Sequence, residues 1–180
     1  MEWTRAGLTA AGFHGFVPFA DLPASPVPPG AGTYIVVRPD AGPPAFLEAN
    51  AGRAVPGRRH TEPLTTLEAA WVTGAEVVYI GKADLGSKGD RGIAKRLDEY
   101  RLHGADLGGS HNGGRYLWQL RDNAALLVAW QESADASATE TEMLDDFIDQ
   151  FGKLPFANLT NGRGSRHSRA RRRTPRMEQA

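Results

Sequence analysis

Two stretches of the chain have the composition of buried β-strands. Residues 33–37 (TYIVV) and 76–80 (EVVYI) are rich in β-branched and aromatic side chains, and a glycine or proline follows each closely. A third region, 115–120 (RYLWQL), alternates by twos, and a polar RDN leads from it into the apolar run 124–130 (AALLVAW). This pattern predicts a β-hairpin.

Two helices are predicted from apolar residues that recur at helical spacing. The first, in the stretch 92–104, has an apolar face made of Ile93, Leu97 and Tyr100. The second, in the stretch 137–152, has a broader face made of Met143, Leu144, Phe147, Ile148 and Phe151. A glycine ends each pattern, so both helices are expected to stop there.

The rest of the sequence predicts one main domain with appendages. Residues 1–30 are predicted to be an N-terminal extension, because the Pro- and Gly-rich stretch PASPVPPGAG forbids regular structure up to Gly32. The main domain is predicted at 31–161, with an insertion at about 39–74 that contains a short helical pattern near TTLEAAW. Residues 162–180 are predicted to be a basic tail without regular structure.

The order of these elements is strand, strand, helix, hairpin, helix. It lacks the repeated alternation of strand and helix that builds a doubly wound sheet. The predicted fold class is therefore α+β, with a small, mainly antiparallel sheet flanked by helices.

Composition indicates one globular domain in a reducing compartment. The 180 residues are 41% hydrophobic and include no cysteine, so a core is available and a disulfide framework is not. No apolar run reaches the roughly 20 residues of a membrane span, and the N-terminal residues lack a signal-peptide core. We expect a cytoplasmic protein that does not enter a membrane.

The formal net charge of zero conceals a division of charge along the chain. The segment after Asn161 contains seven arginines and one acid, Glu178, so it carries about +6 and the preceding residues about −6. A cluster of this kind is typical of an arm that binds phosphates by releasing counterions. The alternative is a tail that only solubilises the protein.

Two predicted strands carry a tyrosine next to a glycine, in GTY at 32–34 and in YIG at 79–81. Either pair alone is not distinctive, because tyrosines in strands commonly just pack their rings. Further polar residues follow in sequence, namely Lys82, Arg96, Tyr100, Glu140 and Asn158. From Gly32 to about Asn161, this set resembles the GIY-YIG endonuclease family.

The resemblance implies a role for each of these residues. Tyr34 and Tyr79 stand at the positions of the two motif tyrosines, and Arg96 stands at that of the catalytic arginine. Glu140 corresponds to the metal-binding glutamate. Asn158, in the P-x-x-N turn of PFAN, corresponds to an amide that ties the elements of the site together.

Arg91 is an alternative to Arg96, because the loop before the helix and the gap between the two motif tyrosines are longer than the family's usual ones. The helical pattern favours Arg96, which lies at the edge of the buried stripe, whereas Arg91 lies beside Gly92 in the loop. Tyr100 lies four residues after Arg96, on the same face of the helix.

Glu142 is an alternative to Glu140. Projection from the apolar stripe predicts that Glu140 faces the sheet. Glu142 is predicted to share a solvated acidic face with Asp145, Asp146 and Asp149.

The activity implied by the resemblance is hydrolysis of DNA phosphodiester bonds with one divalent ion, Mg²⁺ or Mn²⁺, held by Glu140. Arg96 would offer a fork of donors to the phosphate. Tyr34 or Tyr79 would take the proton of the attacking water, and the choice between them stays open. A phenol needs a nearby cation for this, and Lys82 is expected to supply it.

Two other interpretations are kept. His103 and His111 are alternative candidates for a base or a phosphate donor, although neither belongs to a spaced pair that would bind zinc. A noncatalytic nucleic-acid-binding protein with the same fold is the rival to the enzyme.

Overall fold

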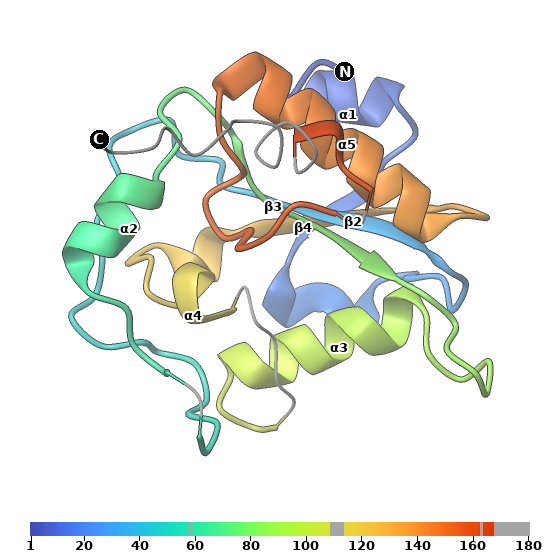
Figure 1. The fold of residues 1–180 in the computed structure, drawn as a ribbon. Helices are drawn as coiled ribbons and strands as arrows, with labels where there is room; N and C mark the ends of the chain where they lie inside the picture. Colours follow the sequence, from blue (N-terminus) through green and yellow to red (C-terminus); the bar gives the residue numbers. More distant parts are fainter. Residues whose placement is uncertain (58, 109–113, 163, 168–180) are drawn as a thin grey trace, which may run out of the picture.

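The computed structural model of the chain contains one four-stranded antiparallel sheet with the strand order β1-β4-β2-β3 (Figure 1). The strands are β1 His14–Pro18, β2 Gly32–Val37, β3 Val77–Ala83 and β4 Leu127–Glu132. The helices are α1 Arg5–Ala10, α2 Leu64–Ala70, α3 Ile93–Gly104, α4 Gly114–Leu117 and α5 Ala136–Phe151, with short 3₁₀ helices η1 Phe19–Ala24 and η2 Asn123–Ala125. The structure describes residues 1–57, 59–108, 114–162 and 164–167. The predicted α+β class with an antiparallel sheet is confirmed.

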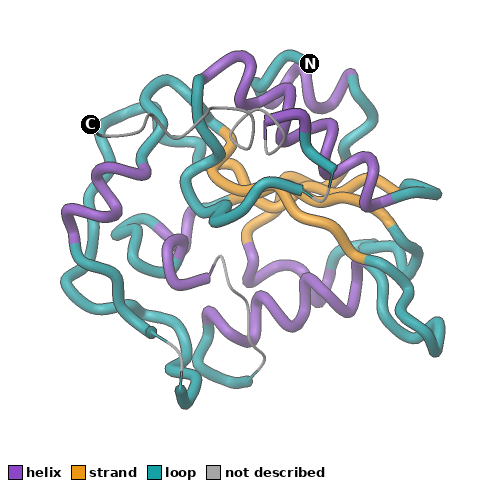
Figure 2. The backbone as a smooth tube through the Cα atoms, in the orientation of Figure 1, coloured by secondary structure: helices purple, strands orange, loops and turns teal. Residues whose placement is uncertain are grey.

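Helices cover both faces of the sheet (Figure 2). Tyr34 and Val36 of β2 belong to the core under α3, whereas Ile35 and Val37 belong to the core under α5 and α1. Because β2 lies between two strands and two layers of helix, all six of its residues are buried. A residue's place in a strand therefore decides which of the two cores it enters.

Both long helices and both motif strands lie where the pattern predicts them. The strands β2 and β3 include 33–37 and most of 76–80, and α3 and α5 match the two helical patterns. Gly152 ends α5 in a left-handed conformation, with φ 77°, which glycine adopts without strain. The helical pattern near TTLEAAW corresponds to α2.

The predicted hairpin at 115–130 is wrong. Its first half forms the one-turn helix α4 and a single bridge between Leu120 and Phe46, and only its second half enters the sheet, as β4. The segment does not alternate in burial, because residues 116–120 are all buried. The predicted insertion covers it: Leu47 N–H donates to Gln119 O at 2.7 Å and Ala51 N–H to Trp118 O at 3.1 Å.

The N-terminal residues contribute to the sheet. The prediction that organised sequence begins at Gly32 is contradicted by β1, which forms one edge of the sheet by pairing with β4. Three residues that precede β1 are buried in the core under α5, namely Trp3, Leu8 of α1 and Phe13. A bulge between Gly15 and Val17 interrupts the alternation of β1, so the strand has no clear signature in the sequence.

Among the described residues, no helix is long and apolar enough to cross a membrane. The predicted basic tail falls mostly on residues 163 and 168–180, which lie outside the described part of the chain.

Candidate active site

Tyr34 and Gly81 face each other in the ladder between β2 and β3. A Cβ atom on Gly81 would lie 2.6 Å from Cζ and 2.7 Å from Oη of Tyr34, and 2.6 Å from Cε1 of Tyr79. Real Cβ atoms do not approach other atoms so closely, so the glycine of YIG is required for both tyrosine rings to occupy this place.

Three tyrosines meet over this glycine. The ring centroids of Tyr34 and Tyr79 are 5.9 Å apart, and Tyr100 of α3 lies edge-on, 6.5 Å from Tyr34 and 5.8 Å from Tyr79. Such spacings and tilts are those of favourable aromatic pairs. Tyr34 and Tyr100 are fully buried, so Tyr79 is the member of the cluster that reaches a surface cavity.

Arg96 is the cation of this cluster. Burial raises the pKa of Tyr34, and the Arg96 guanidinium, which donates a hydrogen bond to the Tyr34 hydroxyl, partly offsets that rise. Burial also raises the pKa of Tyr79 and of Tyr100 well above the ordinary value of a phenol. Tyr34 and Tyr79 are hydrogen-bonded to each other, so a proton can pass between the cavity and the Tyr34 hydroxyl beside Arg96.

Lys82 lies on the other side of the sheet from Tyr79. Residues three apart in a strand point to opposite faces, and Lys82 Nζ donates to Ser137 Oγ of α5 and pairs with Asp84 at 3.7 Å. The expected assistance of Lys82 to a tyrosine is therefore not what the geometry provides. Lys82 instead acts on Glu140, whose pKa it lowers.

Glu140 projects from the first half of α5 into a cavity of about 470 Å³. Burial raises the pKa of its carboxyl, an effect opposed by Lys82 and Arg96 and reinforced by Asp84. Glu142 is exposed, as the helix projection predicts. The cavity is lined by Tyr79, Arg96, Arg115, Glu140, Leu144 and residues 157–162.

Asn158 fastens the chain after α5 to the open edge of β3. Its Nδ2 donates to Ile80 O at 2.7 Å, and its Oδ1 accepts from Ile80 N–H at 2.9 Å. Ala157 N–H also donates to Val78 O at 2.9 Å. The side-chain amide thus takes the place of a backbone partner at an edge strand and holds residues 157–162 as one wall of the cavity.

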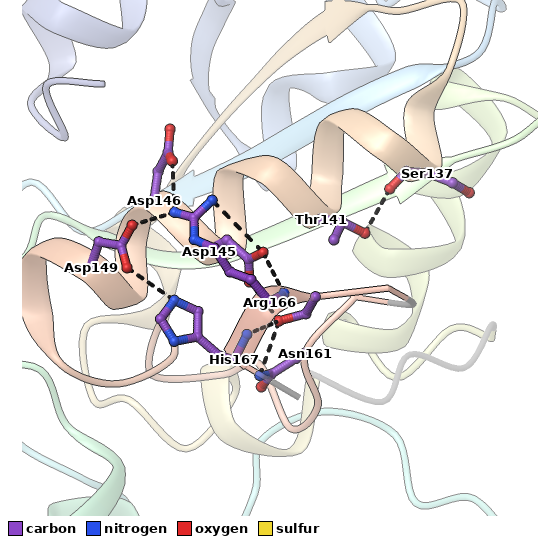
Figure 3. Close-up of polar contacts among 9 residues, drawn as sticks. Ser137, Thr141, Asp145, Asp146, Asp149, Asn161, Arg166 and His167 are labelled. Carbon is purple, nitrogen blue, oxygen red and sulfur yellow. Dashed lines mark hydrogen bonds and ion pairs between the residues drawn. The ribbon is translucent and has the colours of Figure 1, made fainter. Parts of the chain in front are cut away.

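The segment after that wall is held by the acidic face of α5 (Figure 3). Ser165 Oγ donates to Asp145 Oδ1 at 2.5 Å and Arg166 N–H to Asp145 Oδ2 at 3.0 Å. The Arg166 side chain pairs with Asp146 at 3.2 Å and with Asp149, and His167 Nε2 lies 3.0 Å from Asp149 Oδ1. We call residues 164–167 the C-terminal clasp.

The clasp corrects one sequence prediction. Asp145 was expected on a solvated acidic face, but Ser165 and Arg166 cover it, and only 4% of Asp145 is exposed. The first described residues of the predicted tail are therefore part of the folded domain. Nothing in the sequence pairs an acid of α5 with a serine twenty residues later.

Arg115 is a member of the cavity that the sequence did not reveal. It lies on α4, in the stretch interpreted as a hairpin strand, and its Nε is 3.1 Å from Glu62 Oε1. The prediction of a strand at 115–120 gives Arg115 no role in a site. The glycine-rich stretch that precedes Arg115 is the one feature of the sequence that points to a functional loop there. Arg91, the alternative to Arg96, lies close to it, because both arginines pair with Glu99.

The histidines lie apart from the cavity or outside the described residues. His103 is buried, its Nε2 is 3.0 Å from Arg53 O, and burial lowers its pKa. His103 is not among the residues that line the cavity. His111 falls in 109–113, which the structure does not describe.

Among the described residues that line this cavity, Glu140 is the one carboxylate available to a cation. Across the described ranges, no group of three or more histidine, aspartate or glutamate side chains could hold a metal. Glu140 fits a hard ion that keeps its waters and takes one carboxylate, as Mg²⁺ does, because bound cation charge would offset the cost of ionising a half-buried acid. A preformed cage of protein ligands, as structural zinc requires, is not present among these residues.

Comparison of the chain with protein-family models, with curated proteins and with solved structures gave no match in any of the three.

Proposed function

We propose that this chain is a divalent-metal-dependent endonuclease of the GIY-YIG type that hydrolyses DNA phosphodiester bonds. One observation carries the proposal. Tyr79, Arg96, Glu140 and Asn158, which come from four separate segments, line one cavity, and the buried Tyr34 is hydrogen-bonded to Arg96.

The cavity offers the groups that a phosphodiester needs. The Arg96 guanidinium, held at its Nη1 by Glu99 at 3.4 Å, has further N–H groups to donate to nonbridging oxygens, where charge accumulates during attack. Glu140 would hold the Mg²⁺ or Mn²⁺ ion. When bound, such an ion acts as a Lewis acid on the phosphate.

The tyrosine pair would handle the proton of the attacking water. Tyr79 lines the cavity, and Tyr34 is hydrogen-bonded both to Tyr79 and to Arg96. Deprotonation is easiest where the cation offsets burial, so we assign the phenolate to Tyr34. Tyr79 would take the proton of the water and pass its own hydroxyl proton to the Tyr34 phenolate, which ends the step as a neutral phenol. Asn158 positions this pair by holding the backbone of β3 at Ile80.

A second candidate function, noncatalytic binding of nucleic acid, is favoured by one observation. Burial raises the pKa of all three tyrosines of the cluster, which keeps the phenols neutral at physiological pH. A binding site would use the cations of the cavity and leave the phenols as packing.

The two functions are separated by incubating supercoiled plasmid DNA with the protein in Mg²⁺ and in EDTA. The endonuclease should produce nicked and linear plasmid in Mg²⁺ only, and Arg96→Ala should slow their formation on the order of 10²- to 10³-fold. Retarded plasmid without any cleavage, at all metal concentrations and with Mn²⁺ as well, would favour the binding protein.

A further inference from the structure

Each arginine of the cavity shares a glutamate with a second arginine farther out. Glu99 Oε2 lies 3.4 Å from Nη1 of Arg96 and 2.9 Å from Nη2 of Arg91. One carboxylate neutralises one of the two guanidinium groups, so the cluster keeps a positive charge. Arg91 is half exposed, so its charge faces solvent beside the cavity.

Arg115 belongs to a cluster of the same form. Glu62 Oε1 lies 3.1 Å from Arg115 Nε, and Glu62 Oε2 lies 3.2 Å from Arg59 Nη1. Glu62 is only 4% exposed, and its backbone N–H donates to Gln119 Oε1 at 2.7 Å, so this carboxylate is fixed. Arg115 is 34% exposed and Arg59 is 63% exposed, so this cluster also presents its remaining positive charge outward.

The terminal nitrogens of Arg115 are available to a ligand. Glu62 engages the Nε edge, and the Tyr116 ring lies 5.9 Å from the guanidinium carbon. Within the described ranges, no group accepts a hydrogen bond from either Nη of Arg115. A guanidinium paired by charge at its Nε edge, where Nε itself has no hydrogen-bond partner among the described residues, and open at its two Nη groups is arranged for an oxyanion.

We propose that Arg115 is a second phosphate-binding residue of this cavity, in addition to Arg96. Arg91 and Arg59 then bind the phosphates that flank the bound one. This inference rests on the proposed function and extends it to the path of the substrate backbone.

The elements that carry these arginines indicate the path. The loop that leads into α3 and contains Arg91 lies at one end of that helix (Figure 1). The segment that precedes Arg59 lies near the other end of α3, where Arg53 N–H donates to His103 O at 2.8 Å (Figure 1). The backbone of the nucleic acid would therefore run roughly along α3, with the cavity between the two outer arginines.

Binding in EDTA tests this without any cleavage. Fluorescence anisotropy of a labelled duplex, over a series of salt concentrations, should show that Arg115→Ala and Arg59→Ala each weaken binding and lower the log-log salt slope by about 0.9 per lost phosphate contact. Arg101→Ala is the matched control, because Arg101 is paired with Asp98 at 2.7 Å and does not line the cavity. It should change the affinity less than about twofold.

Single-turnover cleavage in Mg²⁺ gives the second readout. Arg115→Ala should slow cleavage at saturating protein at least about tenfold, while Arg59→Ala should change only the concentration needed for saturation. Arg115→Lys keeps the charge and loses the fork, so it should keep the salt slope and remain slow. This variant and the exposed Arg59→Ala keep the test valid if Arg115→Ala does not fold.

The outcomes separate this inference from the proposed function. If Arg115→Ala binds and cleaves like Arg101→Ala, the inference is overturned and the endonuclease stands. If the wild-type protein binds DNA without cleaving it, hydrolysis is rejected, and the salt slopes alone decide the role of Arg115. If the wild-type protein does not bind DNA, both are rejected.

Discussion

Gly81 lies opposite Tyr34 in the β2–β3 ladder, and the Tyr34 ring fills the space that any side chain at position 81 would need. The two motifs that mark this chain, GTY and YIG, are therefore two halves of one packing arrangement. The Tyr34 ring can occupy its place only because residue 81 has no side chain.

Gly81→Ala should destabilise the protein and displace Tyr34 from Arg96. The added methyl would overlap the rings of Tyr34 and Tyr79, which are packed in the core. Overpacking of this kind typically lowers the free energy of unfolding by about 1–3 kcal/mol. Chemical denaturation measures this loss. Gly30→Ala is the control, because its Cβ would meet only the tip of the Glu132 side chain, which can move away. Equal stability of the two variants would contradict the packing argument.

Asn158→Ala should also lower stability, by roughly 1–3 kcal/mol, because it leaves the N–H and C=O of Ile80 without their amide partner. The loss should be accompanied by faster hydrogen exchange at Ile80, which amide exchange spectra can resolve. Asn158→Asp keeps an acceptor for the N–H and loses the donor to the carbonyl. It should therefore not restore full stability.

Glu140→Gln should abolish cleavage, while Glu142→Gln should cleave as the wild type does. The first removes the one carboxylate of the cavity, and the second changes an exposed residue two positions away. A titration of Mg²⁺ with both variants decides this, since excess ion should not rescue Glu140→Gln. Loss of activity in Glu142→Gln instead would reassign the metal ligand.

The Glu140 carboxyl should also make the stability of the protein and its cleavage rate depend on pH. Burial raises the pKa of Glu140 in the folded state, so its proton is bound more tightly in the folded than in the unfolded chain. Its contribution to stability is therefore present below the unfolded pKa and is lost as the pH rises through the folded pKa. Glu140→Gln should consequently melt no lower than the wild type at neutral pH. Cleavage should decline on acidification at a pH above that of an ordinary glutamate.

Arg96→Ala and Arg91→Ala should behave differently although both residues pair with Glu99. Arg96 lines the cavity and bonds to Tyr34, so its loss should slow cleavage on the order of 10²- to 10³-fold, as removal of a charge-stabilising donor does. Arg91 does not line the cavity, and its loss should leave single-turnover cleavage at saturating protein nearly unchanged. Measurement of both rates decides between the two arginines.

Two truncations separate the role of the basic tail in DNA binding from the role of the C-terminal clasp in stability. Deletion of 168–180 removes five of the seven tail arginines and should lower DNA affinity with little change in melting temperature. Deletion of 163–180 also removes Ser165 and Arg166, so Asp145 loses both hydrogen bonds and the residues that cover it. The longer deletion should therefore melt lower and lose cleavage. Equal melting temperatures would show that the clasp does not support the cavity wall.

The parts of the fold that could be predicted have periodic sequences with a single physical cause. In α3 and α5, apolar residues recur because one face packs on the sheet, and β2 is apolar throughout because it is covered on both sides. Arg96 lies on α3 and Glu140 on α5, so the position of each relative to the apolar face of its helix predicts the side on which it projects.

The rest depends on contacts between distant segments. Arg115 lies in a helix of one turn, and its neighbours are buried by the chain around Leu47 and Ala51, which no local pattern specifies. The predicted pairing of Lys82 with a tyrosine is wrong, because alternation along β3 places Lys82 and Tyr79 on opposite faces and Lys82 donates to Ser137, 55 residues later in the chain. The burial of Asp145 depends on Ser165, and such a pair is specified by the tertiary structure alone.

The position of β1 has a consequence for how the protein is made. His14 pairs with Trp130, so β1 must wait until β4 has left the ribosome before it can enter the sheet. Until then its apolar neighbours Leu8 and Phe13 have no core to enter, and pairings of this sequence separation form slowly. Nascent chains that stop short of β4 should therefore be the form of this protein most in need of a chaperone.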